Sequence, residues 1–270
     1  MNKGFGLGPF KLITNMIGGK SLDLASLESG AVHIWYIDAS ARIDSRYYEM
    51  LNACEKIRAE KYKFIKDKNM FITARSVLRM LSAFYLNKTP SQIEIKYGPF
   101  GKPYLYGENR LKFNISHSGC RVVLAFCKQG AIGVDIEKIK TNFDVMEIAE
   151  NYFSEMEVNA LGAIPQADQK KAFFRCWTRK ESFLKAIGEG LSLPLDSFSV
   201  TLDGDKNAVL LETKWDPSEK EKWKMFSFVP DTNYMGAISV HSNIENIKYY
   251  RWDKFKELLL CEERHPNDRQ

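Results

Sequence analysis

The sequence predicts an α+β fold made of two similar halves. The order strand, helices, strands occurs once on each side of residues 129–131, and residues 73–78 and 178–183 share a weakly similar order of apolar and polar side chains. A chain of 270 residues with 44% hydrophobic side chains is long enough to bury a substantial core. We therefore expect three segments: an N-terminal extension at 1–30, an N-terminal half at 31–130 and a C-terminal half at 131–270.

The elements of the first half follow from hydrophobic periodicity and from turn residues. Residues 32–37 are β-branched and aromatic, which is typical of a strand. The basic stretch 45–66 has a helical pattern, and the next helix presents an apolar stripe before Thr89 and Pro90 end it. The expected elements are a strand at 32–37, helices at 45–66 and 67–86, a short strand at 93–96, and a loop through Gly98, Pro99, Gly101 and Pro103.

Three closely spaced strand candidates surround the junction, and a long helix dominates the second half. Gly188 and Gly190 end this helix, because glycine readily adopts the left-handed conformation that closes many helices. Beyond Pro194 the pattern is rich in strands. The expected elements are strands at 111–116, 121–127 and 131–137, helices at 145–153, 155–161 and 166–187, strands at 198–202, 208–211, 224–228 and 237–240, and an amphipathic segment at 253–260.

The composition argues against several classes of protein. The net charge of +5 is mild and spread along the chain, and no nucleic-acid-recognition motif accompanies it. Five cysteines without a Cys-x-x-Cys pair and four histidines without metal-ligand spacing argue against a disulfide framework, a zinc site and a histidine metal centre. The sequence contains neither the apolar core of a signal peptide nor a membrane-length apolar run. We therefore expect a cytoplasmic protein that binds neither nucleic acid nor membrane.

Two acidic residues lie two positions apart in an otherwise apolar strand, GVDIE at 133–137. Asp135 and Glu137 share one face of this strand because strand side chains alternate, and the apolar residues beside them point the other way. The structural alternative is the solvated face of an edge strand. The functional alternative is a magnesium site, since one or two carboxylates together with substrate phosphates hold Mg²⁺ in many proteins.

A carboxylate and an amine lie four positions apart on the long helix, in WTRKESFLK at 177–185. Glu181 and Lys185 share a helix face, and Trp177 lies one turn earlier on it. As an exposed ion pair they would only stabilise the helix, by about 0.3–0.5 kcal/mol. If this face meets the acidic strand, three carboxylates and a lysine converge, which suits Mg²⁺ and a phosphate-bearing substrate.

The segment NISHS at 114–118 places hydroxyls and a histidine near the end of a strand. Alternation puts Asn114, Ser116 and Ser118 on one face and His117 on the other, unless the strand ends near residue 116. A lone histidine is often a structural residue. Hydroxyls, a histidine and a following glycine at a strand end also suit contacts with phosphate.

Basic residues in two other segments could bind phosphates. Lys102 lies in the loop GKP at 101–103, where the neighbouring glycine and proline restrict its geometry. Arg58 and Lys61 are three positions apart on the basic helix and could hold a second phosphate. The structural alternatives are a solubilising loop lysine and a solvated helix face.

In this order and spacing, the motifs resemble the 4′-phosphopantetheinyl transferase superfamily, specifically its large, surfactin-synthetase-activating type. The resemblance covers roughly residues 32–250. The matching segments are GKP at 101–103, FNISHS at 113–118, GVDIE at 133–137, WTRKESFLK at 177–185 and GLSLPLDSFSV at 190–200.

This resemblance implies transfer of the phosphopantetheine arm of coenzyme A to a serine of a peptidyl or acyl carrier protein, with release of adenosine 3′,5′-bisphosphate. Asp135, Glu137 and Glu181 match the family's Mg²⁺-binding acids. Glu181 would also help to deprotonate the serine, directly or through a metal-bound water. Lys185 matches the lysine that neutralises the phosphate, and it could assist the leaving group.

The resemblance also implies which residues contact coenzyme A. One departure concerns Met70, because many relatives carry an arginine shortly after the acidic residue matched by Asp67. The basic helix aligns with a one-residue ambiguity, so Lys56, Arg58 and Lys61 stay open as 3′-phosphate ligands. The matched residues are Ser116 and His117 for phosphate, Lys102 and Pro103 for the nucleotide, and Arg58 with Lys61 for the 3′-phosphate.

The implied family fold has two halves related by a pseudo-two-fold axis, with the active site and coenzyme A in the cleft between them. The large type is monomeric, and the segment 142–169 would face the carrier protein.

One alternative function is a catalytically silent module that binds coenzyme A or the carrier protein. The intact acids and Lys185 argue against it. A nucleic-acid binder is supported only by the modest positive charge.

Overall fold

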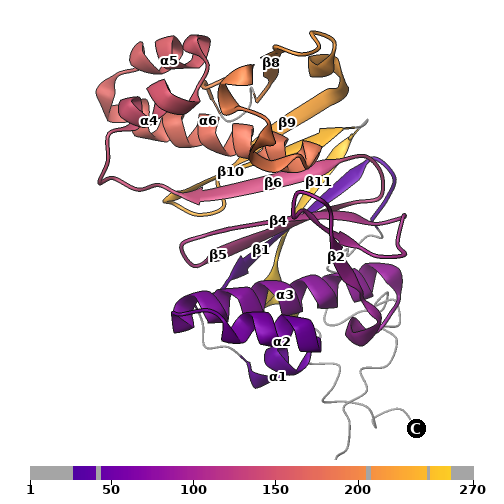
Figure 1. Cartoon of the computed structure of the whole chain (residues 1–270). Helices are drawn as coiled ribbons and strands as arrows, with labels where there is room; N and C mark the ends of the chain where they lie inside the picture. The colour runs from indigo at the N-terminus through magenta and orange to yellow at the C-terminus, as the bar shows by residue number, and fades with distance from the viewer. Residues whose placement is uncertain (1–26, 41–43, 205–207, 242–243, 257–270) are drawn as a thin grey trace, which may run out of the picture.

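Two β-sheets lie between two layers of helices (Figure 1). The structure is a computed structural model that describes residues 27–40, 44–204, 208–241 and 244–256. The helices of the first half cover one sheet, and those of the second half cover the other. This arrangement confirms the α+β fold predicted from the sequence.

Three helices and most strands of a four-stranded sheet form the first half. The long third helix packs against the sheet through apolar side chains such as Leu78 and Leu81, which share a core with Phe126. Its elements are β1 (Ala31–Asp38), α1 (Ser45–Glu49), α2 (Ala53–Glu60), α3 (Ile65–Leu86), the 3-10 turn Pro90–Gln92, β2 (Ile95–Tyr97), β3 (Pro103–Leu105), β4 (Lys112–Ser118) and β5 (Arg121–Cys127).

The single helix predicted at 45–66 is wrong, because a helix cap divides it. Asn52 begins α2 by accepting a hydrogen bond from the Glu55 N–H, and the Glu55 carboxylate accepts one from the Asn52 N–H. Such a cap requires extended backbone at Asn52, which a continuous helix does not allow. Phe64 is extended as well, so α3 begins at Ile65 instead of at residue 67.

The second half contains a three-stranded sheet, a β-ribbon and three helices. Its long helix has the bounds predicted from the sequence, and Gly188 closes it in the left-handed conformation at a φ of 85°. The elements are β6 (Ile132–Lys138), α4 (Val145–Tyr152), α5 (Glu155–Gly162), α6 (Gln166–Ile187), β7 (Phe198–Val200), β8 (Leu210–Thr213), β9 (Trp223–Phe228), β10 (Tyr234–His241) and the 3-10 turns Gly190–Ser192, Leu195–Ser197 and Glu219–Lys222.

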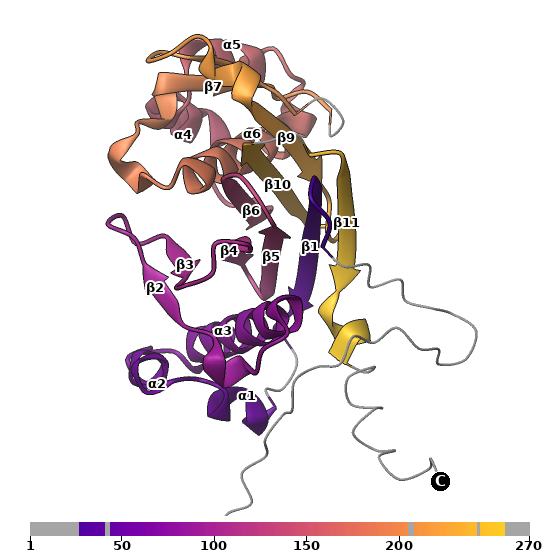
Figure 2. The same cartoon turned by 90° about the vertical axis from the view of Figure 1, so that its right-hand side faces the viewer.

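The last described strand returns to the first sheet (Figure 2). β11 (Asn246–Arg251) pairs in parallel with β1, so the first sheet has the order β11-β1-β5-β4. The second sheet has the order β6-β10-β9.

The sequence does not predict β11, because none of its side chains is fully buried and its alternation is weak. β3 is likewise found where a loop is predicted. The predicted segment 253–260 is helical over its described part, and the rest lies outside the described residues.

Three apolar clusters separate the layers. One lies between the first sheet and α1–α3, and another lies between the second sheet and α4–α6. The third contains side chains of both sheets, including Ile34 of β1, Val123 of β5 and Ile238 of β10. None of the helices in the described ranges is long and apolar enough to cross a membrane.

Candidate active site

The two faces of β6 have different roles. Val134 and Ile136 belong to the apolar cluster between the sheets. Gly133, Asp135 and Glu137 therefore face the other way, as strand alternation predicts. A Cβ atom on Gly133 would lie 2.0 Å from the backbone oxygen of Ser182, so the backbone of α6 packs directly on this face.

This close packing brings the predicted acid and amine together. Lys185 of α6 forms an ion pair of 2.5 Å with Asp135 Oδ1 and donates to Ser116 Oγ at 3.0 Å. The Asp135 side chain is only 3% exposed. Its second oxygen, Oδ2, is buried and has no hydrogen-bond partner within the described ranges. A buried carboxylate oxygen without a partner is costly, and a bound cation would remove that cost.

Glu137 and Glu181 complete a group of three mutually repelling carboxylates. Burial raises the pKa of Glu181, and the charges of Asp135 and Glu137 add to the shift. Burial also raises the pKa of Glu137, with a further contribution from Asp135. The carboxylate of Glu181 forms no hydrogen bond or ion pair with another described residue. The combined negative charge of the three carboxylates favours binding of a proton or a cation at the site.

The donor set fits a hard cation. Carboxylate oxygens are the ligands that Mg²⁺ prefers, and Asp135 Oδ2 is buried without a hydrogen-bond partner in the described structure. Among the residues that the structure describes, however, no three His, Cys, Asp or Glu side chains are close enough together to hold a metal ion as they stand. Glu181, whose carboxylate no hydrogen bond holds among the described residues, is the acid most able to move toward Asp135 and Glu137 when a cation binds.

β4 supplies the polar wall of the site. It extends beyond residue 116 to Ser118, so the alternation predicted for this segment continues to its end. Ser116 Oγ donates to Asp135 Oδ1 at 2.8 Å, and Ser118 Oγ donates to Glu137 Oε2 at 2.6 Å. The role of Ser118 was not apparent from the sequence, although its position two residues after Ser116 places it on the same face.

His117 lies on the opposite face of β4 and is exposed. Neighbouring groups nevertheless remove part of the water around its imidazole and so lower its pKa, and the positive charge of Lys185 lowers this pKa further. The negative charges of Asp135 and Asp67 act in the other direction. His117 is therefore near enough to these groups to interact with them, although it shares no hydrogen bond with any of their side chains in the described structure.

Lys102 joins the two halves. Its Nζ donates to the backbone oxygens of Ala186 at 2.9 Å and Ile132 at 3.2 Å. Burial lowers the pKa of Lys102 to about 8. The adjacent Pro103 lies in β3, opposite Tyr97. Together with Phe100, Asn114, Glu181 and Lys185, Lys102 and Pro103 line a pocket of about 280 Å³ beside the carboxylates.

The basic residues of α2 are not brought into the carboxylate site. Arg58 is exposed and donates to the hydroxyl of Tyr97 at 2.9 Å, and its guanidinium lies over the ring of Phe71. Arg75 donates to the same hydroxyl at 2.5 Å. Sequence patterns missed Arg75, because it lies within an apolar helix face. Lys61 is exposed at the end of α2.

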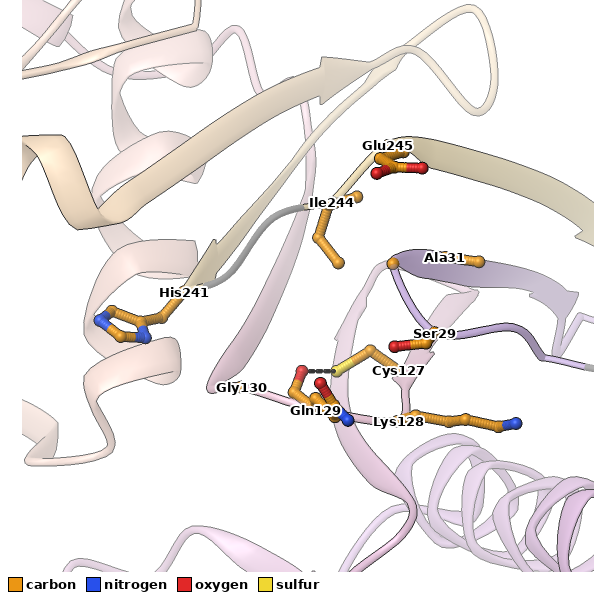
Figure 3. Close-up of a pocket in the computed structure, with 10 residues that line it drawn as sticks. Ser29, Ala31, Cys127, Lys128, Gln129, Gly130, His241, Ile244 and Glu245 are labelled. Carbon is orange, nitrogen blue, oxygen red and sulfur yellow. Dashed lines mark hydrogen bonds between the residues drawn. The ribbon is translucent and has the colours of Figure 1, made fainter.

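A second, larger cavity lies away from this site (Figure 3). It has a volume of about 600 Å³ and is lined by the 128–130 loop, the start of β1 and residues at the end of β10. Figure 3 shows His241 directed away from it, and the Cys127 thiol donates to the Gln129 oxygen at 3.2 Å. None of the predicted site residues lines this cavity.

Comparisons with known proteins confirm the family that the sequence resembles. A family model described as the 4′-phosphopantetheinyl transferase superfamily matches residues 131–238, and one described as the N-terminal part of a 4′-phosphopantetheinyl transferase matches residues 42–129. A putative 4′-phosphopantetheinyl transferase of Synechocystis sp. is 31% identical over 82% of this chain and 95% of its own length. The transferase HetI of Nostoc sp. is 30% identical over 80% and 90%, and Sfp of Bacillus subtilis strain 168 is 35% identical over 60% and 71%.

Proposed function

The chain belongs to the 4′-phosphopantetheinyl transferase superfamily, and we propose that its donor is coenzyme A and its acceptor a serine of an apo peptidyl or acyl carrier protein. The chain is an enzyme of this transferase class. One structural observation carries the proposal for its site. Lys185 of α6 contacts Asp135 of β6 and Ser116 of β4, and the charges of Glu137 and Glu181 interact with this pair.

The proposed reaction is a displacement at phosphorus. The serine Oγ forms a bond to the phosphorus that carries the pantetheine arm, and the bond from that phosphorus to the bridging oxygen breaks. Adenosine 3′,5′-bisphosphate leaves with the bridging oxygen. Such a transfer depends on positioning and charge neutralisation more than on covalent catalysis.

Asp135, Glu137 and Glu181 are the residues that would hold Mg²⁺ in this proposal. When bound, the ion would supply positive charge against the pyrophosphate. Glu181 would take the serine proton, directly or through a water. Its carboxylate supports this role, because no hydrogen bond or ion pair occupies its oxygens among the described residues.

Lys185 would neutralise charge on the transferred phosphate and on the leaving group. Its ammonium already reaches the first-half residue Ser116 and the second-half residue Asp135. We assign Ser116 and His117 to phosphate contacts, and Lys102 and Pro103 to the nucleotide. The 280 Å³ pocket beside the carboxylates supports the nucleotide assignment, because the loop of Lys102 and Pro103 lines it.

Arg58 and Lys61 are proposed to hold the 3′-phosphate. The exposed positions of both residues on α2 leave their charges open to a ligand. The residue boundaries 1–30, 31–130 and 131–270 stay the proposed division of the chain. We also propose a cytoplasmic monomer.

The carrier protein is proposed to dock on residues 142–169. α4 and α5 lie in this segment and expose Tyr152 and Met156 beside the helix that carries Glu181. Exposed apolar side chains of this kind suit an apolar residue next to the reactive serine of the carrier.

Mass spectrometry tests the function. Purified protein with Mg²⁺, coenzyme A and several apo carrier proteins should add the mass of phosphopantetheine to at least one carrier. Glu181→Gln should reduce this transfer at least about 100-fold, since the charge of a proposed base and metal ligand is lost. Glu221→Gln changes an exposed glutamate outside the site and serves as the matched control.

Two outcomes would count against the proposal. Coenzyme A binding without a mass shift on any carrier would favour a silent module. Full transfer by a folded Glu181→Gln variant would contradict the metal assignment.

A further inference from the structure

The two halves meet where the edge strands of both sheets lie side by side. β4 ends the first sheet, and β6 ends the second. Across the described residues, no backbone hydrogen bond joins these strands. An edge strand presents a row of N–H groups, and those buried between the halves need partners.

Side chains of β4 provide the missing partners. Asn114 Oδ1 accepts a hydrogen bond from the Val134 N–H at 2.9 Å, Ser116 Oγ from Ile136 at 3.4 Å, and Ser118 Oγ from Lys138 at 3.0 Å. The sequence separation is 20 residues in all three cases, so the strands run in parallel with a constant offset. We call these three side chains, Asn114, Ser116 and Ser118, the β4 ladder.

The two serines of the β4 ladder also bind the acids. Ser116 Oγ donates to Asp135 at 2.8 Å and Ser118 Oγ to Glu137 at 2.6 Å, with a separation of 19 residues in both cases. A serine has one hydroxyl proton and accepts through its lone pairs. Because each oxygen already accepts an N–H of β6, its proton is directed to the carboxylate.

We propose that Ser118 is a positioning residue that orients the Glu137 carboxylate for cation binding, as Ser116 orients Asp135. The inference rests on the proposed function, because the cation belongs to it. Ser118 fixes Glu137 relative to the β6 backbone through the Lys138 N–H. It links the first half directly to the second-half cation site.

A substitution at Ser118 tests this positioning role better than one at Ser116, because Ser116 has further contacts. Ser116 also receives a hydrogen bond from Lys185 and is proposed to contact phosphate. Every hydrogen bond of the Ser118 side chain in the described structure goes to Glu137 or to the Lys138 N–H. Loss of a group that orients a metal ligand typically weakens metal affinity 10–100-fold.

The test measures Mn²⁺ binding by electron paramagnetic resonance of free Mn²⁺, with coenzyme A present and no carrier protein. Ser118→Ala should weaken Mn²⁺ affinity about tenfold. Ser118→Thr keeps the hydroxyl and should restore most of it. Ser40→Ala is the matched control, because Ser40 also donates to a carboxylate, that of Asp38 at 2.6 Å, outside the site.

The outcomes separate the inference from the proposed function. Unchanged Mn²⁺ affinity in Ser118→Ala, or no rescue by Ser118→Thr, would overturn the inference while leaving the transferase assignment intact. Absence of Mn²⁺ binding by the unaltered protein would overturn the metal assignment together with the inference.

A thermal unfolding curve without Mn²⁺ identifies a merely structural role. Such a role would lower the unfolding temperature of Ser118→Ala without changing the affinity of the remaining folded protein for Mn²⁺. Positioning predicts a weakened affinity in protein that is folded at the assay temperature.

Discussion

At the scale of single residues, Lys185 links oxygens from different halves of the molecule. Its ammonium lies 2.5 Å from Asp135 Oδ1 on β6 and 3.0 Å from Ser116 Oγ on β4. The lysine side chain is 30% exposed, whereas that of Asp135 is 3% exposed. Asp135 therefore needs Lys185 as a counter-charge, whereas water can still solvate the more exposed lysine.

Lys185→Met should remove most activity and some stability. We expect transfer to fall at least about 100-fold, because a charge that stabilises the reacting phosphate is lost. The free energy of unfolding should fall by about 1–2 kcal/mol, since Asp135 stays buried without its counter-charge but solvent screens part of the pair. Mass-spectrometric transfer rates and urea unfolding measure the two effects.

A matched lysine controls this prediction. Lys214 is 64% exposed and lies 3.5 Å from Asp196 at the surface. Lys214→Met should change the free energy of unfolding by less than about 0.5 kcal/mol. More than half of the normal transfer rate in Lys185→Met would contradict the role given to Lys185.

The sequence predicted which residues share a face, and it could not predict their partners. Strand and helix periods place Asp135 with Glu137 and Glu181 with Lys185. In the structure Asp135 and Lys185 are in contact. The bonds from Ser116 and Ser118 depend on the offset between β4 and β6, which no local pattern encodes.

At the scale of elements, Gly133 sets the distance between α6 and β6. A Cβ atom there would lie 2.0 Å from the Ser182 oxygen and 2.3 Å from the Ala186 nitrogen, both backbone atoms. Neither atom can move without moving the helix. The absence of a side chain at this position thus allows the helix face with Lys185 to reach the acidic strand.

Gly133→Ala should separate these elements. We expect a loss of about 3 kcal/mol in the free energy of unfolding, the upper end of typical overpacking. Transfer by the remaining folded protein should also fall, because α6 carries Glu181 and Lys185. Guanidinium unfolding and transfer rates test this.

Gly204→Ala is the matched control, since a Cβ atom there would meet nothing within 4 Å. An unchanged unfolding midpoint in Gly133→Ala would show that α6 does not pack on β6 in this way.

Element prediction succeeded where local chemistry decides the outcome. α6 has its predicted bounds because a long helical pattern ends at Gly188. The helix predicted at 45–66 failed because the cap at Asn52 interrupts a pattern that otherwise looks continuous. A capping signal within a charged stretch therefore outweighed the helical periodicity.

At the scale of the whole molecule, long-range pairing is what the sequence does not show. β11 reaches β1 across more than two hundred residues, with Ile34 opposite Tyr249. Behind this pair of strands lies an aromatic cluster, in which the Trp35 ring stacks on Tyr250 at 4.7 Å and His33 packs edge-on against the same ring at 5.0 Å. The cluster links the C-terminal strand to α3 through Tyr85.

His33 makes the stability of this junction dependent on pH. Its Nδ1 is 2.8 Å from the Tyr85 hydroxyl, and its Nε2 is buried without a hydrogen-bond partner in the described chain. Burial lowers the pKa of His33 from 6.5 to about 4, and the charge of Lys248 adds to the shift. Between these values the unfolded chain binds a proton that the folded chain does not. The contribution of neutral His33 to the free energy of unfolding is therefore fully present above pH 6.5, and it is lost as the pH falls toward 4.

Urea unfolding at pH 7.5 and pH 5.0 tests this sign. His33 should account for about 2 kcal/mol of the decrease in unfolding free energy between the two values. The decrease should be smaller by that amount in His33→Phe, while His241→Phe, which alters an exposed histidine, should behave like the unaltered protein. An equal decrease in His33→Phe and the unaltered protein would show that His33 is not the group that couples pH to the junction of β1, β11 and α3.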